Sequence, residues 1–276
     1  MKSWKTVLGL TAASALTILA ACGGDSESGS GDDKTLVVGA SNVPHAEILE
    51  HVKDEYEEKG YKLEIKKFQD YVLPNKTLAD GDIDANYFQH QPYLDLQMKD
   101  NKDYKFASAG GVHVEPIGIY SQDYKSLDEL PDGGEIIMSS NVAEHGRMLT
   151  LLQNEGVITL ADGKTTDATV ADIVDNPKNL KFTMNVEAAL LPQAYNNGEG
   201  DAVIINTNYA IDAGLSPLDD SIALEGEDSP YVNLIVTREG EEDDERVKAL
   251  LEVLTTKETQ DWILEEYEGA VIPVNN

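Results

Sequence analysis

The sequence predicts an α/β protein that folds as two lobes. Short apolar runs with strand character and amphipathic helical patterns keep exchanging along the chain, which is typical of parallel α/β sheets. Residues 118–233 hold strand and helix units of their own, and the apolar run from Pro116 to Tyr120 can lead the chain out of a first lobe. Tyr231 to Thr237 has the pattern of a returning strand. We therefore expect lobe I from residues 35–117 and 234–276 and lobe II from residues 118–233.

Charge is the outlying feature of the composition. The 276 residues include 21 Lys and Arg against 51 Asp and Glu, a formal net charge of −30. Binding to nucleic acid is excluded as a function class, because a phosphate-binding surface needs clustered Lys and Arg. The acidic residues are scattered along the chain, which indicates a solvated acidic surface.

The first 34 residues have the pattern of an export signal and a tether. A short basic start is followed by the apolar run from Val7 to Ala21, which is too short to span a bilayer comfortably. Leu19-Ala20-Ala21-Cys22 resembles the lipobox of bacterial lipoproteins, in which the signal is cut before a cysteine that is then lipidated. We expect a signal peptide over residues 1–21, and a lipidated Cys22 with a flexible tether over residues 22–34.

Cys22 is also the single cysteine, so an internal disulfide framework and a Cys-rich metal site are excluded. The alternative is a plain secretory signal with an incidental cysteine. With two or three acyl chains on Cys22, the protein would stay at the extracytoplasmic face of the cell membrane.

The elements of lobe I follow from local patterns. Leu36 to Ala40 is an apolar strand, after which Ser41-Asn42 and Pro44 suit the start of a helix that Gly60 ends. The further expected elements, in order, are a strand at 61–68, a helix at 72–80, a strand before Gln91, a helix after Pro92, and strands at 106–110 and 116–120.

Lobe II and the end of the chain repeat the exchange. Expected strands are 135–139, 180–184, 201–206 and 231–237, and expected helices are 144–155, 186–195, 243–254 and 257–267.

The stretch from Asp80 to Tyr93 is the first candidate binding region. Asn86, Phe88 and His90 alternate along the expected strand, and Pro92 then suits the first position of a helix. In an open α/β sheet, ligands bind beyond the carboxyl ends of the strands. The alternative is a buried strand end with core aromatic residues and a hydrogen-bonded histidine.

Arg147 is the second candidate. It lies in the first turn of a helix after Ser139-Ser140-Asn141, so cap hydroxyls, free N–H groups and a guanidinium can form a carboxylate site. The alternative is an arginine paired with one of the many acids.

The histidines give little support for a metal site. His45, Glu47 and His51 share an expected helix, but the six-residue spacing of the histidines places them on different faces, so solvated helix residues are the favoured interpretation. His113 and Glu115 are interpreted as structural or as lying at the lobe crossing. No G-x-S-x-G, H-E-x-x-H or phosphate-cradling motif is present in the sequence, which argues against an enzyme.

Several segments together resemble one family, the methionine-binding lipoproteins of bacterial ABC importers (the NlpA/MetQ-type lipoproteins). The resemblance covers the mature chain in order, and its most specific segment is Asn86 to Leu94. The other matching segments are the lipobox, Leu36 to Ala40, Phe68 to Asn75, Glu115 to Ser121, Ile204 to Ala210 and Ser229 to Val236.

The resemblance implies a two-lobed, type II periplasmic-binding-protein fold with a ligand cleft between the lobes. It implies a protein that is not an enzyme, needs no cofactor and no metal, and passes methionine, D-methionine or a methionine-containing dipeptide to a membrane permease with its ATPase. Family ligand contacts map onto Tyr71, Phe88, His90, Tyr93, Arg147, Asn206 and Asn233.

One segment departs from the family pattern. The family usually carries a P-N-D-x-[TS]-N-like loop before the arginine, whereas this chain has Ser140 to Gly146, which looks a residue shorter and lacks the second Asn. The departure bears on which group supports the ligand backbone. Rival functions are a metal-binding lipoprotein of similar two-lobed design, a lipid-anchored enzyme, and an adhesin or structural lipoprotein.

Overall fold

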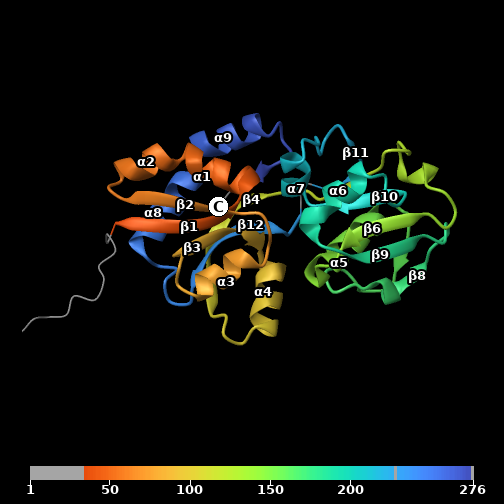
Figure 1. Ribbon diagram of the computed structural model, residues 1–276, viewed down its shortest axis with the longest axis horizontal. Helices are drawn as coiled ribbons and strands as arrows, with labels where there is room; N and C mark the ends of the chain where they lie inside the picture. The colour runs from red at the N-terminus through yellow and green to blue at the C-terminus, as the bar shows by residue number, and fades with distance from the viewer. Residues whose placement is uncertain (1–33, 227–228, 275–276) are drawn as a thin grey trace, which may run out of the picture. The chain divides into compact units, whose positions relative to one another are not determined.

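The computed structural model describes residues 34–226 and 229–274 (Figure 1). The predicted signal peptide, Cys22 and nearly all of the tether lie outside the described residues. Within the described part, no helix combines the length and apolar character needed to cross a bilayer.

Two mixed sheets organise the fold. The first has the strand order β13-β4-β12-β3-β1-β2, with β1 (Thr35–Ser41), β2 (Lys62–Phe68), β3 (Ala85–His90), β4 (Phe106–Val114), β12 (Val232–Arg238) and β13 (Ile272–Pro273). β1 lies parallel to β2 and β3, whereas β12 inserts antiparallel between β3 and β4. The alternation of strands and helices along the sequence predicted a parallel sheet. The structure differs, because the return strand β12 is antiparallel to both neighbouring strands and makes the sheet mixed.

The second sheet has the order β11-β5-β10-β6-β9. Its strands are β5 (Gly118–Tyr120), β6 (Glu135–Ser139), β9 (Lys181–Val186), β10 (Ala202–Ile205) and β11 (Ser221–Leu224). β6 is parallel to β9 and β10, and β5 is antiparallel to β10 and β11. A small hairpin of β7 (Thr159–Leu160) and β8 (Ile173–Asp175) stands apart from both sheets.

Helices cover both faces of the six-stranded sheet, as Figure 1 shows. One face carries α2 (Lys53–Glu58), α8 (Glu245–Leu254) and α9 (Lys257–Glu266). In the sequence, a π-type turn at Asn42–Ala46 and the short helix α1 (Glu47–His51) come before α2. The other face of the sheet carries α3 (Leu73–Ala79) and α4 (Gln91–Asp100). Buried apolar side chains of β1, α1 and α8 form the core between sheet and helices, because each helix turns one apolar stripe inward.

The five-stranded sheet packs against α5 (Val142–Asn154) and α6 (Leu191–Asn196), and α7 (Thr207–Asp212) contacts the π-type turn after β1. Short 3-10 turns occupy Leu127–Glu129, Val170–Asp172 and Ala188–Leu190.

Two expected helices differ from the structure. The helix expected to run unbroken from His45 to Lys59 is divided into a turn and two short helices that meet at Val52. The helix expected from Val186 starts only at Leu191, because Val186 ends β9 and Glu187 is extended. Pro192 lacks an N–H and so suits the first turn of α6 better than a helix interior.

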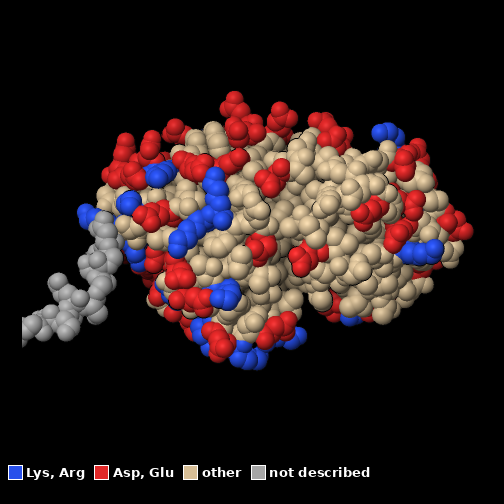
Figure 2. Space-filling model, in the orientation of Figure 1, with Lys and Arg blue, Asp and Glu red and all other residues tan. Residues whose placement is uncertain are grey.

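Acidic side chains dominate the surface. Figure 2 shows Asp and Glu spread over the visible face, with fewer Lys and Arg among them. Many of the basic side chains pair with a nearby acid, as Lys76 does with Asp80 at 2.6 Å. Exposed pairs of this kind contribute little to stability, and the surplus of acid remains solvated.

Gly146 sets the position of α5. A Cβ at this position would overlap the backbone carbonyl of Thr166, so the helix rests directly on the segment before β8. Only glycine allows that approach.

Gly146→Ala is therefore expected to destabilise the protein by about 1–3 kcal/mol, because α5 must move away from that segment. Urea unfolding measures the change. Val142→Ala, at an exposed position of the same helix, is the matched control and should stay within about 0.5 kcal/mol of the parent. Equal stability of Gly146→Ala and the parent would contradict this account of the packing.

Candidate functional site

A pocket lies where strand ends of the two sheets face each other. Its walls include all seven residues that the sequence singled out, Tyr71, Phe88, His90, Tyr93, Arg147, Asn206 and Asn233. Phe88 and Arg147 thus share one cavity, although 59 positions separate them in the chain (147 − 88). The remaining lining residues are His45, Gln89, Glu115, Asn141, Glu144, Thr207 and Asn208.

Buried amides hold the strand that carries Phe88 and His90. Every residue of β3 is buried, so its polar side chains need partners inside the protein. Asn75 of α3 donates to Gln89 at 2.9 Å, and its carbonyl oxygen accepts from Asn86 at 2.9 Å and from Gln89 at 2.8 Å. These bonds fix the end of β3 against α3.

Three aromatic rings form the apolar wall. The ring centroids of Tyr71, Phe88 and Tyr93 lie 5.9–6.1 Å apart, within the range of favourable aromatic contacts. The Tyr93 hydroxyl donates to the Tyr71 carbonyl at 2.7 Å, and the Tyr71 hydroxyl donates to Asn208 at 2.6 Å. The rings are thereby fixed in orientation where they line the pocket.

Glu144 provides a buried carboxylate on the opposite wall. The Nδ1 atom of His90 accepts the Tyr93 backbone N–H at 3.3 Å, so its Nε2 carries the hydrogen that it donates to Glu144 at 2.5 Å. The Asn206 amide donates to the other carboxylate oxygen at 3.2 Å. Burial alone would raise the pKa of the Glu144 carboxyl, but His90, Arg147 and Asn206 together lower it to about 2.

Arg147 is paired on most of its guanidinium. Its Nε and Nη2 donate to one carboxylate oxygen of Glu225 at 3.0 and 2.5 Å, and Nη2 also donates to the Glu115 carbonyl at 2.6 Å. The guanidinium carbon lies 4.4 Å from the centre of the Tyr231 ring. Nη1 lies 3.5 Å from Glu144. The sequence left open the alternative that Arg147 is paired with an acid. The structure shows this pairing, with Arg147 lying in the wall of the pocket.

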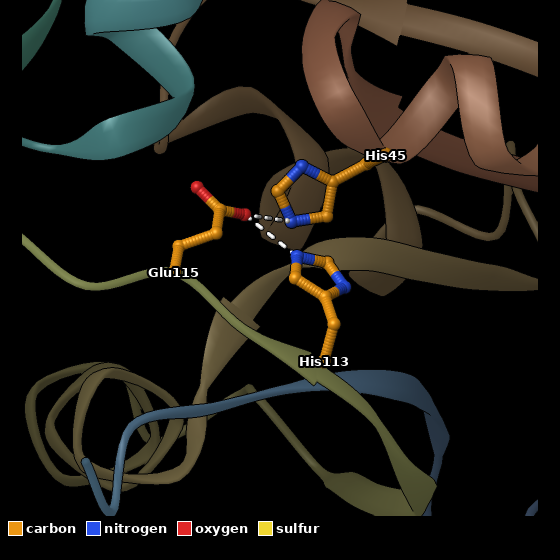
Figure 3. Close-up of side chains that lie close together, drawn as sticks. All are labelled: His45, His113 and Glu115. Carbon is orange, nitrogen blue, oxygen red and sulfur yellow. Dashed lines mark hydrogen bonds and ion pairs between the residues drawn. The ribbon is translucent and has the colours of Figure 1, made fainter. Parts of the chain in front are cut away.

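His45, His113 and Glu115 form a second buried cluster, next to the first (Figure 3). One carboxylate oxygen of Glu115 lies 2.8 Å from His113 Nε2 and 3.2 Å from His45 Nε2. The Tyr87 hydroxyl lies 2.5 Å from His113 Nδ1, so Nε2 of that ring donates to Glu115. His45 Nε2 also lies 3.0 Å from the Asn233 carbonyl oxygen, which ties a pocket residue to the cluster.

Burial governs the protonation of this cluster. It lowers the pKa of His45 to about 4 and that of His113 to about 3, and it raises the pKa of Glu115. Their nearest ligand atoms all lie within 4.8 Å of one another, a geometry that could hold a metal ion. A metal would have to replace the hydrogen that His113 Nε2 directs at Glu115 and the contacts of His45 Nε2 with Asn233 and Glu115.

The interpretation of His45 as a solvated helix residue is wrong. His45 is 1% exposed, because the turn after β1 directs it beneath the sheet ends, where it contacts Tyr87 and His113. His51 instead stacks on Trp262 with ring centroids 3.9 Å apart, and Glu47 accepts the Tyr267 hydroxyl at 2.8 Å. The three residues of that expected helix therefore do not form one site.

Comparison with known proteins gives the family. The family model described as NlpA lipoprotein matches residues 36–275. The chain belongs to the NlpA lipoprotein family.

Proteins similar to this chain match it over most of its length. The methionine-binding lipoprotein MetQ of Bacillus subtilis (strain 168) is 53% identical over 261 residues, which are 94% of each chain. The solved structure of a nutrient binding protein from Burkholderia cenocepacia, bound to methionine, has a TM-score of 0.81 and 40% identity, over 87% of this chain and all of that one. An ABC transporter, periplasmic substrate-binding protein from Coxiella burnetii has a TM-score of 0.80 and 37% identity, over 87% of this chain and all of that one.

Two acids and one histidine that line the pocket, Glu144, Glu115 and His45, were not predicted as site residues from the sequence, and neither was Glu225, which pairs with Arg147. Glu144 and Glu225 lie among many acids, and His45 and Glu115 were assigned structural or solvated roles. The position of Glu144 three residues before Arg147 places both on one face of α5 and could have indicated the pair. No local pattern points to Glu225, which reaches Arg147 from 78 positions away.

The buried imidazoles make stability depend on pH. In the unfolded chain each imidazole binds a proton below about pH 6.5, whereas in the folded protein His45 and His113 stay neutral to about pH 4 and about pH 3. The unfolded state then holds more protons, so the free energy of unfolding should fall as the pH falls from 6.5 towards 4. Each imidazole contributes up to about 1.4 kcal/mol per pH unit.

Urea unfolding between pH 7.5 and 4.5 measures this slope, and His113→Gln should reduce it by about one imidazole's share. Glu115, whose pKa burial raises, works in the opposite direction at the lower end of this window and is present in both proteins. His51→Gln, at an exposed position, is the control that should keep the parent's slope. An unchanged slope in His113→Gln would refute the neutral, buried assignment.

Proposed function

We propose that this protein captures methionine, or a close relative such as D-methionine or a methionine-containing dipeptide, and delivers it to the permease of an ABC importer. The single observation that carries the proposal is the pocket that joins an aromatic wall to a buried arginine, carboxylate and amide set. The methionine bound to the Burkholderia cenocepacia relative supports the same ligand class.

The two walls suit the two ends of methionine. The thioether would lie among Tyr71, Phe88 and Tyr93, because sulfur is favourable at aromatic edges. Burial of a methionine-sized side chain contributes about 1.5–3 kcal/mol. Hydrogen bonds to charged groups add about 1.5–3 kcal/mol each, from Arg147 and from the amides of Asn206 and Asn233.

Arg147 would meet a ligand carboxylate through its Nη1 side, because Glu225 occupies Nε and Nη2. A symmetric fork on the carboxylate, which the sequence suggested, would require Glu225 to move away. His90 acts here as a hydrogen-bond donor to Glu144, and ligand capture requires no proton transfer from it.

Closure of two lobes would complete the site. No single contact reaches the roughly −8 kcal/mol of a micromolar complex, so both walls must act on one ligand with water excluded. We propose lobe I as residues 35–117 and 234–276 and lobe II as residues 118–233. The sheets support this division, although β12 begins at Val232, two residues before the proposed boundary, so that Asn233 pairs with β3 and β4 of the six-stranded sheet.

Loss of either polar contact should weaken methionine binding strongly. Arg147→Ala and Asn233→Ala are each expected to reduce the affinity for methionine at least roughly tenfold, because each removes one charged or buried hydrogen bond to the ligand. Isothermal titration calorimetry measures the affinity. Asn197→Ala removes an exposed amide and is the matched control. Circular dichroism checks that each variant is folded, and parent-like binding by a folded variant would remove that residue from the site.

Membrane attachment is proposed to depend on Cys22. Its sequence context resembles a lipobox, and two or more acyl chains hold a protein at a membrane durably, whereas one chain gives only marginal binding.

Cys22→Ser should therefore move the protein from the membrane fraction to the soluble fraction and abolish labelling with radioactive palmitate. Ser26→Ala, in the predicted tether, is the control that should stay membrane-bound. Palmitate incorporation into Cys22→Ser would contradict the lipidation site.

A further inference from the structure

His45 connects the buried histidine cluster to a ligand-contacting residue of the proposed site. Its ring comes from the turn after β1 and is 1% exposed. The Nε2 atom lies 3.0 Å from Oδ1 of Asn233 and 3.2 Å from a carboxylate oxygen of Glu115. The proposed function assigns a role to Asn233 and none to His45, although the two side chains are in contact.

The surroundings of Nε2 decide which ring nitrogen of His45 carries the hydrogen. Burial keeps the ring neutral, because it lowers the pKa of His45 to about 4. A neutral imidazole has one N–H and one lone pair, whereas an amide oxygen and an ionised carboxylate can only accept. Since one oxygen of each kind lies beside Nε2, a lone pair there would be repelled by both. Nε2 therefore carries the hydrogen and directs it at Asn233.

This hydrogen bond fixes the side-chain amide of Asn233. The backbone at this position is already set, because β12 pairs Asn233 with His90 of β3 and His113 of β4. The amide could still turn by 180° and exchange its donor and acceptor ends. With Oδ1 bound by His45, the Nδ2 end is left for the pocket that Asn233 lines. Within residues 34–226 and 229–274, Nδ2 has no acceptor.

The support of His45 extends to its buried neighbours (Figure 3). The Tyr87 hydroxyl lies 2.5 Å from His113 Nδ1, and Nε2 of that ring donates to Glu115 at 2.8 Å. Glu115 is thereby held as an acceptor beside His45. The His45 ring also packs edge-on against Tyr87, with ring centroids 4.6 Å apart. A buried polar network of this kind holds its members in one arrangement.

We propose that His45 is a positioning residue for ligand capture. By donating to Oδ1 it holds the Asn233 amide with the nitrogen free to donate to an acceptor atom of the ligand, such as a carboxylate or carbonyl oxygen. If the amide turned, Oδ1 would face that ligand atom and Nδ2 would face the hydrogen of His45. The inference rests on the proposed function and adds to it that recognition by Asn233 depends on His45.

A buried histidine can also serve packing alone, and two substitutions separate these roles. His45→Met removes the donor and keeps an adaptable apolar side chain. His45→Gln restores an N–H donor, which the acceptors of Glu115 and Asn233 would orient.

Calorimetry with methionine on the full chain compares the two variants. We expect His45→Met to weaken binding roughly 10- to 100-fold and His45→Gln to stay within roughly threefold of the parent. His51→Met, at an exposed position of the following helix, is the matched control and should bind as the parent does. Thermal unfolding of each variant establishes that it is folded.

A double-mutant cycle tests whether His45 acts through Asn233. In an Asn233→Ala background, the loss caused by His45→Met should shrink to less than roughly threefold, because the amide that His45 orients is gone. A purely structural role of His45 would weaken binding by the same factor in both backgrounds. Thermal shift over rising methionine concentration follows the weakened affinities.

Asn233→Asp tests the donor role without changing His45. Its carboxylate can still accept from His45 but offers the ligand only acceptor oxygens, so binding should weaken at least roughly tenfold. The inference is overturned if a folded His45→Met or Asn233→Asp binds methionine as tightly as the parent. It is also overturned if His45→Gln is as weak as His45→Met, or if the losses from His45→Met and Asn233→Ala simply multiply.

Failure of the proposed function gives a different result. If methionine does not bind the parent, thermal-shift measurements with the twenty amino acids and with methionine-containing dipeptides identify the ligand, and the same variants are compared with it. A different amino acid that shows both the His45→Met loss and the His45→Gln rescue overturns methionine and keeps the positioning role. No stabilisation by any of these compounds overturns both.

Discussion

The bond between His90 and Glu144 is the contact on which the polar site depends. His90 ends β3 of the six-stranded sheet, and Glu144 lies in the first turn of α5, which packs on the five-stranded sheet. A carboxylate that is 1% exposed needs donors, and His90 and Asn206 supply them from two further segments. The need to satisfy this one charge therefore brings together the ends of β3, α5 and α7.

Arg147 extends the same network to the segments that pass between the sheets. Its guanidinium binds the carbonyl of Glu115, directly after β4, and the carboxylate of Glu225, directly after β11. The Tyr231 ring, just before β12, packs against it. One side chain thus contacts both crossing segments, which holds it rigidly but also leaves little of its charge for a ligand.

Glu115 has a comparable role on the other side of the pocket. Its carboxylate accepts a hydrogen bond from His113 of β4 and lies 3.2 Å from the His45 imidazole, which comes from the turn after β1. Both rings are neutral because burial lowers their pKa values far below those of free histidine. The cluster supports Asn233 through His45, so the amide that is proposed to contact the ligand depends on a histidine deeper in the protein.

The sequence by itself determined most strands and helices, but not β7, β8, α7 and β11. Local signals were sufficient for the expected elements, because a turn before β3, Pro92 at the start of α4 and Gly60 at the end of α2 act within a few residues. The aromatic residues Tyr71, Phe88 and Tyr93 were named as ligand contacts through the family resemblance. The Asn86 to Leu94 segment is specific enough to identify the family that the comparisons then showed.

Tertiary structure alone decided which acids are functional neighbours and which histidines are buried. Among 51 acidic residues, nothing local distinguishes Glu144, Glu115 and Glu225 from the solvated ones. Their burial, and the pairing of Glu225 with Arg147 across 78 positions, follow from how two sheets bring distant strand ends together. Charge pairing in a buried pocket depends on distance in space and on exclusion of water, and neither is encoded in short-range sequence patterns.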